Sequence, residues 1–379
     1  MSEVFETNEI AYRSCILYEA VRKTPLEDAY KNMKEVKPNV EYSDFEYWYY
    51  RFSNGQHDLK HDRSKDPKSL GFSDMPIDVV DNIIGYLGLV DKLSTRKVCR
   101  QLRAVIDKQS SKFGDVGLTI DEESCEVCYE DSTIEYSAVE NENCLLKSPR
   151  KTISLKGDDW MMALEEFASV ITHPKWSFQS VSIVISRKDS HPENERKLLL
   201  FFNSLLSNHQ IHVDSLYMNA YSFESLAMLL PHFKTDTLSF CPLFPLEDTQ
   251  ENLFEAILKM DRWKNLTKIH IDRFPDGFPI EALFHVRECD VRSVELTENR
   301  LTKIRDILFK TPTFAHFEFR DEKDENREDL PVLIDRVMGA HDAYNSHDKV
   351  YRIENSKDYI QISIKGPRSD QLDIRRIRS

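Results

Sequence analysis

The stretch of residues 72–106 constrains the fold of this chain more than any other. It opens with Met75-Pro76, and proline suits a first helical turn because its missing N–H would be unpaired there anyway. Apolar side chains then recur at roughly helical spacing. We predict one helix to about Leu87, a break marked by Gly88, and a second helix from Ser94. The apolar positions are Ile77, Val79, Val80, Ile83, Ile84, Leu87, Leu89, Leu93, Val98 and Leu102.

A helical hairpin of this length buries too little surface to be stable alone, so its apolar stripe must pack against another domain or another chain. Spacing does not choose between them. The stretch resembles an F-box, with the Met75-Pro76 pair, the Ile83-Ile84 block before Leu87, the Asp91 to Leu93 turn and Val98-Cys99-Arg100 in order. The resemblance implies docking onto a Skp-type adaptor and, through it, onto the cullin of a ubiquitin ligase. The implied adaptor-binding residues are Met75, Pro76, Ile77, Val80, Ile83, Ile84, Leu87, Leu93, Val98 and Leu102.

Leu102 departs from the F-box pattern. Many members carry tryptophan or phenylalanine at the position that Leu102 occupies here. The resemblance therefore implies an adaptor affinity below the family norm.

The overall composition bounds the function. At 379 residues with 40% hydrophobic residues, the chain is long enough for two or three domains. A net charge of −14 argues against general binding to nucleic acid or to an anionic membrane. We find no secretory signal and no apolar run of membrane-spanning length, and the seven scattered cysteines do not form a disulfide framework. These features predict a protein of the cytoplasm, the nucleus or both, without membrane contact.

The first part of the chain predicts a small domain of three helices, residues 8–56, followed by a polar linker, residues 57–71. Thr24 with Glu27, and Ser43 with Glu46, have the spacing of capping boxes that start the second and third helices. An aromatic stripe then marks the third helix as facing a core. The stripe consists of Phe45, Trp48, Tyr49 and Phe52.

This first domain resembles the helix-turn-helix at the front of mariner-type transposases and of many nematode F-box proteins. In DNA-binding relatives the third helix enters the major groove. Residues 1–66, however, carry ten basic against thirteen acidic residues, a net charge of −3. The predicted recognition helix is itself acidic and aromatic, which favours contact with protein over DNA. A transposon-derived DNA-binding regulator remains the alternative.

Beyond residue 110, short β-rich runs alternate with amphipathic segments, a pattern typical of strand–helix units. The strand starts are 21 to 33 residues apart, a range that includes leucine-rich repeats, but the repeats are irregular. We predict strands at residues 180–185, 213–218, 237–240, 266–271, 293–296 and 314–319. The predicted helices are residues 158–170, 192–207, 223–230, 251–260, 279–284 and 299–310.

Part of this half resembles the FTH domain, of undetermined activity, which follows the F-box in a large nematode family. The matching segments, in order, are residues 262–266, 301–314, 351–355 and 359–362. We assign residues 115–379 to this domain. A curved repeat stack presents an extended strand face suited to holding another protein. Because side chains alternate along a strand, every second residue lies on the same face, but the pattern does not say which face is open. The predicted target-binding residues on this basis are Tyr217, Lys268, His270, Glu295, His316 and Glu318, with Ser182, Val184, Ser215 and Ser239 beside them.

We find no sequence motif for catalysis or cofactor binding, and the chain has only ten glycines. Cys125 and Cys128, with Cys144 further on, have zinc-like spacing, but the fourth ligand would have to come from as far away as His173. The segment around Cys125 alternates like a strand, which would turn the two cysteines to opposite faces. We therefore expect reduced cysteines and no metal. The charged run of residues 321–329 is either a solvated loop or a contact for a basic target.

Together these features predict an α+β or α/β multidomain protein. It has a three-helix domain, then a helical F-box over residues 72–108, then an irregular leucine-rich-repeat-like β/α solenoid. The predicted role is a non-catalytic substrate-recognition subunit of a ubiquitin ligase, which holds an unidentified target protein near the ligase.

Overall fold

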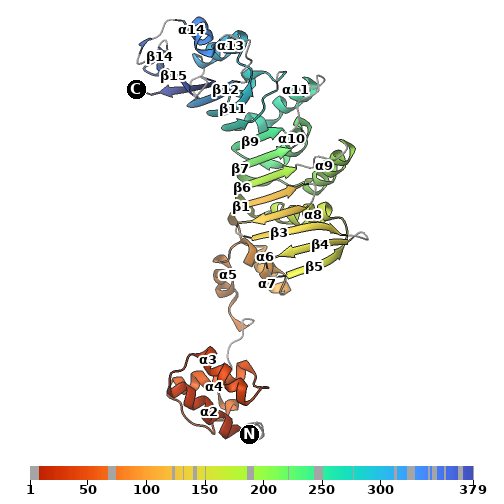
Figure 1. Ribbon diagram of the computed structural model, residues 1–379, viewed down its shortest axis with the longest axis vertical. Coiled ribbons are helices and arrows are strands. Elements are labelled where there is room, and N and C mark those ends of the chain that lie inside the picture. Colours follow the sequence, from red (N-terminus) through yellow and green to blue (C-terminus); the bar gives the residue numbers. More distant parts are fainter. Residues whose placement is uncertain are drawn as a thin grey trace. The chain divides into compact units, whose positions relative to one another are not determined.

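The computed structural model divides the chain into two compact units, residues 1–76 and 77–379, called here the N-terminal and C-terminal units (Figure 1). No helix in the described part of either unit is long and apolar enough to cross a membrane. The structure describes residues 8–66, 74–121, 124–130, 132–139, 143–149, 151–185, 192–220, 222–242, 251–275, 277–310, 314–321, 329–339, 342–343, 348–353, 356–365 and 370–378.

The N-terminal unit contains the three predicted helices: α2 (Glu9–Val21), α3 (Leu26–Val36) and α4 (Tyr42–Ser53). Asn8 caps α2, because its side chain accepts hydrogen bonds from the backbone N–H groups of Ile10 and Ala11.

Both predicted capping boxes are wrong. Pro25, not Thr24, occupies the N-cap of α3, and Glu41, not Ser43, occupies that of α4. Neither cap residue makes a side-chain capping bond. The extended conformation of Pro25 leaves Thr24 one residue too far from the first helical turn for its hydroxyl to reach an unpaired N–H.

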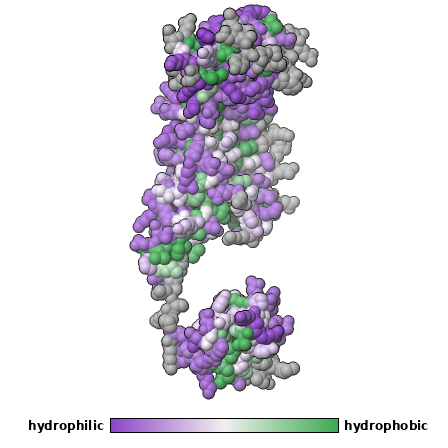
Figure 2. Space-filling view, turned by 90° about the vertical axis from the view of Figure 1, so that its left-hand side faces the viewer, coloured by the Kyte–Doolittle hydropathy of each residue, from purple (hydrophilic) through white to green (hydrophobic). Residues whose placement is uncertain are grey.

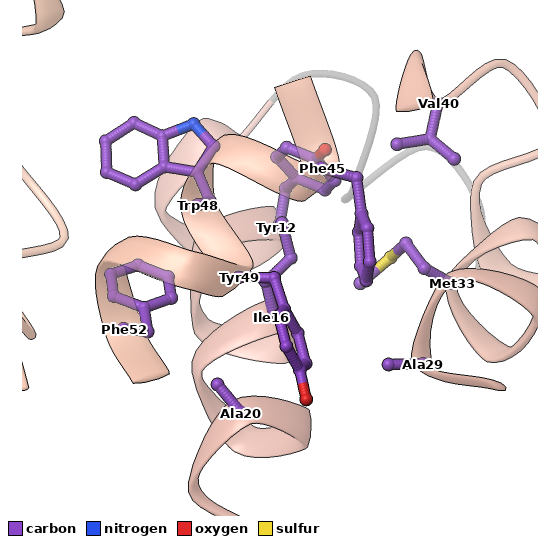
Figure 3. Close-up of a cluster of buried hydrophobic side chains, with 10 residues drawn as sticks. All are labelled: Tyr12, Ile16, Ala20, Ala29, Met33, Val40, Phe45, Trp48, Tyr49 and Phe52. Carbon is purple, nitrogen blue, oxygen red and sulfur yellow. The ribbon is translucent and has the colours of Figure 1, made fainter. Parts of the chain in front are cut away.

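The aromatic stripe of α4 forms the core of the N-terminal unit, as predicted (Figure 3). Phe45 and Trp48 are almost fully buried and pack with side chains of α2 and α3. The guanidinium of Arg13 lies 4.0 Å from the centre of the Trp48 ring. The buried set is Tyr12, Ile16, Ala20, Ala29, Met33, Val40, Phe45, Trp48, Tyr49 and Phe52.

Residues 57–66, where the sequence suggests a linker, lie against this unit. Arg13 donates a hydrogen bond to the backbone oxygen of Leu59 (2.9 Å), and Leu59 packs against the core. Asp66, which follows the short turn η1 (Arg63–Lys65), accepts from Tyr47 and from His61. The N-terminal unit therefore extends ten residues beyond residue 56, where the predicted three-helix domain ends.

The C-terminal unit begins with three short helices instead of the two predicted: α5 (Ile77–Gly85), α6 (Leu89–Arg96) and α7 (Arg100–Ile106). Gly88 and Cys99 are extended at the N-caps of α6 and α7, so the chain turns before each helix. The predicted second helix from Ser94 is interrupted at Lys97 to Cys99, because α6 and α7 pack against each other and not end to end. Their shared interior includes Val80, Ile84, Leu89, Leu102, Val105 and Ile106.

In the described residues, sixteen strands form one mixed sheet. Its centre is seven parallel strands that neighbour one another in chain order. They are β1 (Ser111–Ile120), β6 (Trp176–Ile185), β7 (Ile211–Ala220), β9 (Thr237–Pro242), β10 (Lys268–Ile271), β11 (Glu288–Val294) and β12 (His316–Asp321).

Antiparallel strands extend the sheet at both ends. Beyond β1 lie β2 (Cys125–Tyr129), β3 (Ser132–Val139), β4 (Asn143–Ser148) and β5 (Lys151–Lys156). Beyond β12 lie β16 (Gln371–Ile377), β15 (Tyr359–Lys365), β14 (Asp348–Arg352) and β13 (Asp342–Ala343), and the short β8 (Phe233–Lys234) pairs with β7.

Helices follow the parallel strands along one side of the sheet (Figure 1). Buried residues alternate with more exposed ones along most of each central strand, so one face is buried and the other is open. The alternation is interrupted once in β1, at Gly114 and Asp115, and once in β6, at Gln179 and Ser180. The helices and turns are α8 (Asp159–Ile171), α9 (Pro192–Leu206), α10 (Phe223–Leu229), η3 (Leu230–His232), α11 (Glu251–Lys259), α12 (Asp261–Lys264), η4 (Ile280–Leu283), α13 (Glu298–Leu308) and α14 (Leu330–Met338).

Five of the six predicted strands coincide with β6, β7, β9, β10 and β12. The strand predicted at residues 293–296 is wrong, since β11 starts at Glu288 and ends at Val294. Ser293 has a positive φ of 49°, and the pairing with β12 shifts register there. The antiparallel strands β3 to β5 were not predicted.

Candidate functional site

The helices α5 to α7 separate the predicted adaptor-binding residues into three groups. Pro76, Ile77, Ile83 and Val98 are exposed, and Ile77 and Val98 keep 50% and 72% of their surface. Met75, Leu87 and Leu93 are half-buried. Val80, Ile84 and Leu102 are buried inside the C-terminal unit. These last three side chains hold the helices together and do not face solvent.

A stripe of exposed apolar side chains follows one face of α5 and continues to Tyr86 in the turn after the helix. Val79, Ile83 and Tyr86 are spaced four and three residues apart, which puts them on the same side of a helix. They remain 46%, 41% and 85% exposed. We call these three residues the α5 stripe. Figure 2 shows hydrophobic surface gathered at the end of the C-terminal unit where α5 to α7 lie. Val79 and Tyr86 were absent from the sites predicted from the sequence.

A buried lysine fixes the helices to the sheet. Lys92 of α6 is only 2% exposed, and its Nζ donates to Gln109 Oε1 (3.0 Å) and to Ser111 Oγ (2.7 Å) at the start of β1. Burial lowers the pKa of Lys92. Gln109 in turn donates to the backbone oxygen and side chain of Asp81 on α5 (2.7 and 2.8 Å). One side-chain network therefore joins α5, α6 and β1.

A second contact joins α6, the end of α7 and the chain before β6. Asp107 accepts from Arg96 Nε at 2.6 Å and lies 3.5 Å from His173 Nε2. The hydrogen bond from Arg96 holds the pKa of Asp107 below its ordinary value. The His173 ring stacks on Trp176 with centres 4.0 Å apart, and burial lowers the pKa of His173. We call the Lys92 and Asp107 contacts together the joint.

The cysteines do not assemble a metal site among the described residues. Cys125 is buried and lies 3.8 Å from Asp159, whereas Cys128 is on the other face of β2, near Thr133. His173, the distant fourth ligand that zinc would need, contacts Asp107 instead. Burial raises the pKa of four thiols, which keeps them protonated and poorly nucleophilic: Cys15, Cys144, Cys241 and Cys289.

Five of the six predicted target-binding residues lie on the open face of the sheet. The strand register places Lys268 beside His316 through Glu288, and His270 beside Glu318 through Asp290. The two rows continue into β7 as Ser215 and Tyr217. Glu295 is the exception, because it lies beyond the end of β11. Tyr217 is 46% exposed among small polar neighbours, Ser182 and Ser239.

The open face is densely charged at β10 to β16. Lys268 pairs with Glu288 (2.7 Å), and His270 pairs with Asp290 (2.8 Å). Asp373, only 2% exposed, accepts from Lys365 (2.5 Å) and Arg375 (2.9 Å). Burial alone would raise the pKa of Asp373, but the hydrogen bonds from Arg375 and Lys365 outweigh burial and lower it.

His316, Glu318 and Asp373 have ligand atoms within 4.8 Å of one another, close enough for a metal ion. Their other contacts identify them as an ion-pair network. Two cations already neutralise Asp373, and Glu318 accepts from Gln371 (2.7 Å).

The surface of α4 bears on DNA contact. Its one basic residue, Arg51, is 15% exposed and lies 3.8 Å from Asp66. The nearby Arg63 pairs with Asp44 (2.8 Å). Tyr42 and Tyr50 are the exposed aromatic residues of this helix, at 43% and 51%. The surface of α4 thus presents aromatic rings, and the positive charges on and near it are paired with carboxylates.

Comparison with known proteins finds three domain families along the chain. Residues 9–56 match the helix-turn-helix domain in Mos1 transposase, residues 72–114 match the F-box domain, and residues 196–334 match the FTH domain. The chain is also 28% identical over 362 residues to F-box A protein 224 of Caenorhabditis elegans, an alignment that covers 93% of this chain and 92% of that protein. The three resemblances read from the sequence are confirmed.

Proposed function

Because this chain is an F-box protein, with a Mos1-type helix-turn-helix before the F-box and an FTH domain after it, we propose that it is the substrate-recognition subunit of a Skp–cullin–F-box ubiquitin ligase. The α5 stripe carries the proposal. F-box domains bind Skp-type adaptors, and the stripe offers exposed apolar surface on the matched segment.

The α5 stripe has the physical properties of a protein-binding surface. Three large side chains aligned on one helix face can enter an apolar groove on a partner. Burying a valine or isoleucine side chain contributes about 1.5 to 3 kcal/mol. Ile77 and Val98 are exposed apolar residues of the same segment outside the stripe. Leu102 would act indirectly, since it supports the helices from inside.

The open face of the sheet is the proposed docking site for the target protein. We interpret the succession of parallel strands and helices as an irregular leucine-rich-repeat-like solenoid, a fold whose strand faces form extended binding surfaces. On this surface Tyr217, Lys268, His270, His316 and Glu318 are the proposed contacts. The protein itself catalyses nothing in this proposal. Its contribution is proximity, because a tethered target lysine meets the charged conjugating enzyme at high effective concentration.

Adaptor co-purification tests the proposal. Val79→Asp puts a charge at the first position of the α5 stripe, and we expect at least a tenfold loss of adaptor binding, about 1.4 kcal/mol or more. Val332→Asp is the matched control, because Val332 is 49% exposed on α14 of the same unit. Equal adaptor binding by both variants would refute the assignment of the stripe.

The N-terminal unit is proposed to contact protein, with DNA as the alternative. Arg51 of α4 and the nearby Arg63 already pair with carboxylates, and the N-terminal unit is acidic overall; both observations support this choice. A duplex gel-shift series across salt concentrations distinguishes the two. Salt-sensitive binding to any duplex would favour the DNA-binding regulator. The proposed place of action is the cytoplasm, the nucleus or both.

A further inference from the structure

Two arginines occupy neighbouring positions at one edge of the open face. Arg292 in β11 and Arg320 in β12 each follow the paired residues Val291 and Phe319 by one position. Those paired residues are buried, so the arginines alternate to the open side. The Arg292 side chain is 42% exposed, and Arg320 is also exposed.

Both arginines have N–H groups that no described residue accepts. Arg320 makes no hydrogen bond or ion pair with any described residue. Arg292 lies 3.6 Å from Asp290 through a terminal nitrogen. Its Nε is buried without an acceptor in the described part of the chain, so the exposed part of this side chain lies on its other atoms. Of the neighbouring carboxylates, Glu288, Glu318 and Asp373 all accept at 2.9 Å or less, whereas Asp290 keeps one buried oxygen without a donor among the described residues.

The strand register extends this edge into a row. Arg320 pairs across β16 with Gln371, and Gln371 pairs across β15 with Lys365. Adjacent strands are about 4.8 Å apart, so the four side chains span about 14 Å, the length of roughly four extended residues. We call Arg292, Arg320, Gln371 and Lys365 the donor row.

We propose that the donor row binds an acidic segment of the target protein, with glutamate or aspartate carboxylates seated on Arg292 and Arg320. This inference rests on the proposed function and names the chemistry of its target. An occupant must supply acceptors, because a guanidinium group carries only N–H donors. The guanidinium fork matches a carboxylate in two parallel hydrogen bonds, which gives direction as well as attraction.

The row also stands out against the rest of the molecule. The chain carries a net charge of −14, so most of its surface repels an acidic peptide. Three of the four side chains of the donor row are cationic. Lys365 already pairs with Asp373, so Arg292 and Arg320 supply most of the attraction. An acidic segment is therefore favoured at this edge over the other faces of the protein.

Fluorescence anisotropy of the full chain with a labelled decapeptide of alternating glycine and glutamate tests the proposal. Arg320→Gln should weaken binding about tenfold, as expected for one lost bidentate pair, and Arg292→Gln should act in the same direction. Arg287→Gln is the matched control. Arg287 is exposed and immediately precedes β11, so it lies at the opposite end of that strand from Arg292. Its replacement should change the affinity for the peptide less than about twofold.

Three results would overturn the proposal: no binding by the unmodified chain, an equal loss with Arg287→Gln, or binding only when phosphoserine replaces glutamate in the peptide. Matched peptides with glutamine or lysine should not bind. Adaptor binding is measured on the same variants. Arg320→Gln should leave adaptor binding intact, so a failed peptide experiment with normal adaptor binding rejects the donor row alone and leaves the ligase role standing.

Discussion

Asp373 shows how a buried carboxylate supports the far end of the sheet. Two cations hold it ionised, and its pKa is lowered. A lowered pKa stabilises the fold above the ordinary value of about 3.9 and loses that stabilisation as pH falls through the folded-state pKa. Lys365 and Arg375 are 45% and 54% exposed, which limits the gain.

Asp373→Asn should therefore lower the free energy of unfolding at neutral pH by about 1 to 3 kcal/mol. It should also flatten the decline in stability between about pH 5 and pH 3. Urea unfolding across that range is the measurement. Asp306→Asn is the control, since Asp306 is 50% exposed beside Arg305. If both variants keep the same pH profile as the unmodified chain, the Asp373 network does not contribute.

The sequence predicts which candidate site residues share one face of the sheet, because side chains alternate along each strand. Tyr217, Lys268, His270, His316 and Glu318 share the open face because side chains alternate along every strand. Glu295 does not share this face, because β11 ends at Val294, just after the irregularity at Ser293. On α5, spacing identified the apolar residues but not which of them face solvent. That depends on how α5 meets α7 and β1, and these contacts are long-range.

The helix α4 carries the core of the N-terminal unit. Trp48 is 1% exposed and packs against Phe52 and Tyr47. Replacing a buried tryptophan by alanine costs about 3 to 5 kcal/mol, a large share of the stability of so small a unit.

We expect Trp48→Ala to unfold residues 8–66 while the C-terminal unit stays folded and keeps its adaptor binding. Loss of dispersed amide signals from the N-terminal unit in an NMR spectrum is the measurement. Tyr50→Ala, on the exposed side of the same helix, should leave the spectrum unchanged. Simultaneous unfolding of both units would contradict their independence.

Among whole elements, the sequence predicted those with a strong local pattern. The helices of the N-terminal unit and five of the central strands follow directly from apolar periodicity. The antiparallel strands β3 to β5 are largely polar and half-exposed, so their composition resembles that of loops. Short helices such as α6 and α7 depend on tertiary packing more than on propensity, which is why two segments were predicted as one.

At the scale of the molecule, the joint sets how the helices α5 to α7 are held against the sheet. Arg96, Asp107 and His173 are drawn from α6, from the end of α7 and from the chain before β6. Because Arg96 and Asp107 are 37% and 35% exposed, their pair contributes about 1 kcal/mol or less. Its main effect is on orientation and not on global stability.

Asp107→Asn should loosen α7 without unfolding the sheet. Backbone amides of α7 should then exchange with deuterium faster, and those of β6 and β7 should not. Asp214→Asn, which removes an ion pair between 58% and 59% exposed side chains on the sheet, is the control. Unchanged exchange in α7 would mean that the Lys92 network alone holds the helix.

Only four residues, Asp107 to Ser110, separate α7 from β1. Asp107 contacts Arg96, the backbone oxygen of Lys108 accepts from Lys175, and Gln109 contacts Lys92. Ser110 is the one residue of the four without such a side-chain-mediated contact in the described structure. An insertion between Asp107 and Gln109 would displace at least one of these contacts, whereas an insertion at Ser110 lies after all three. The length of this spacer is therefore fixed by its contacts. Among related proteins, we expect insertions in the spacer to occur at Ser110 before any other position.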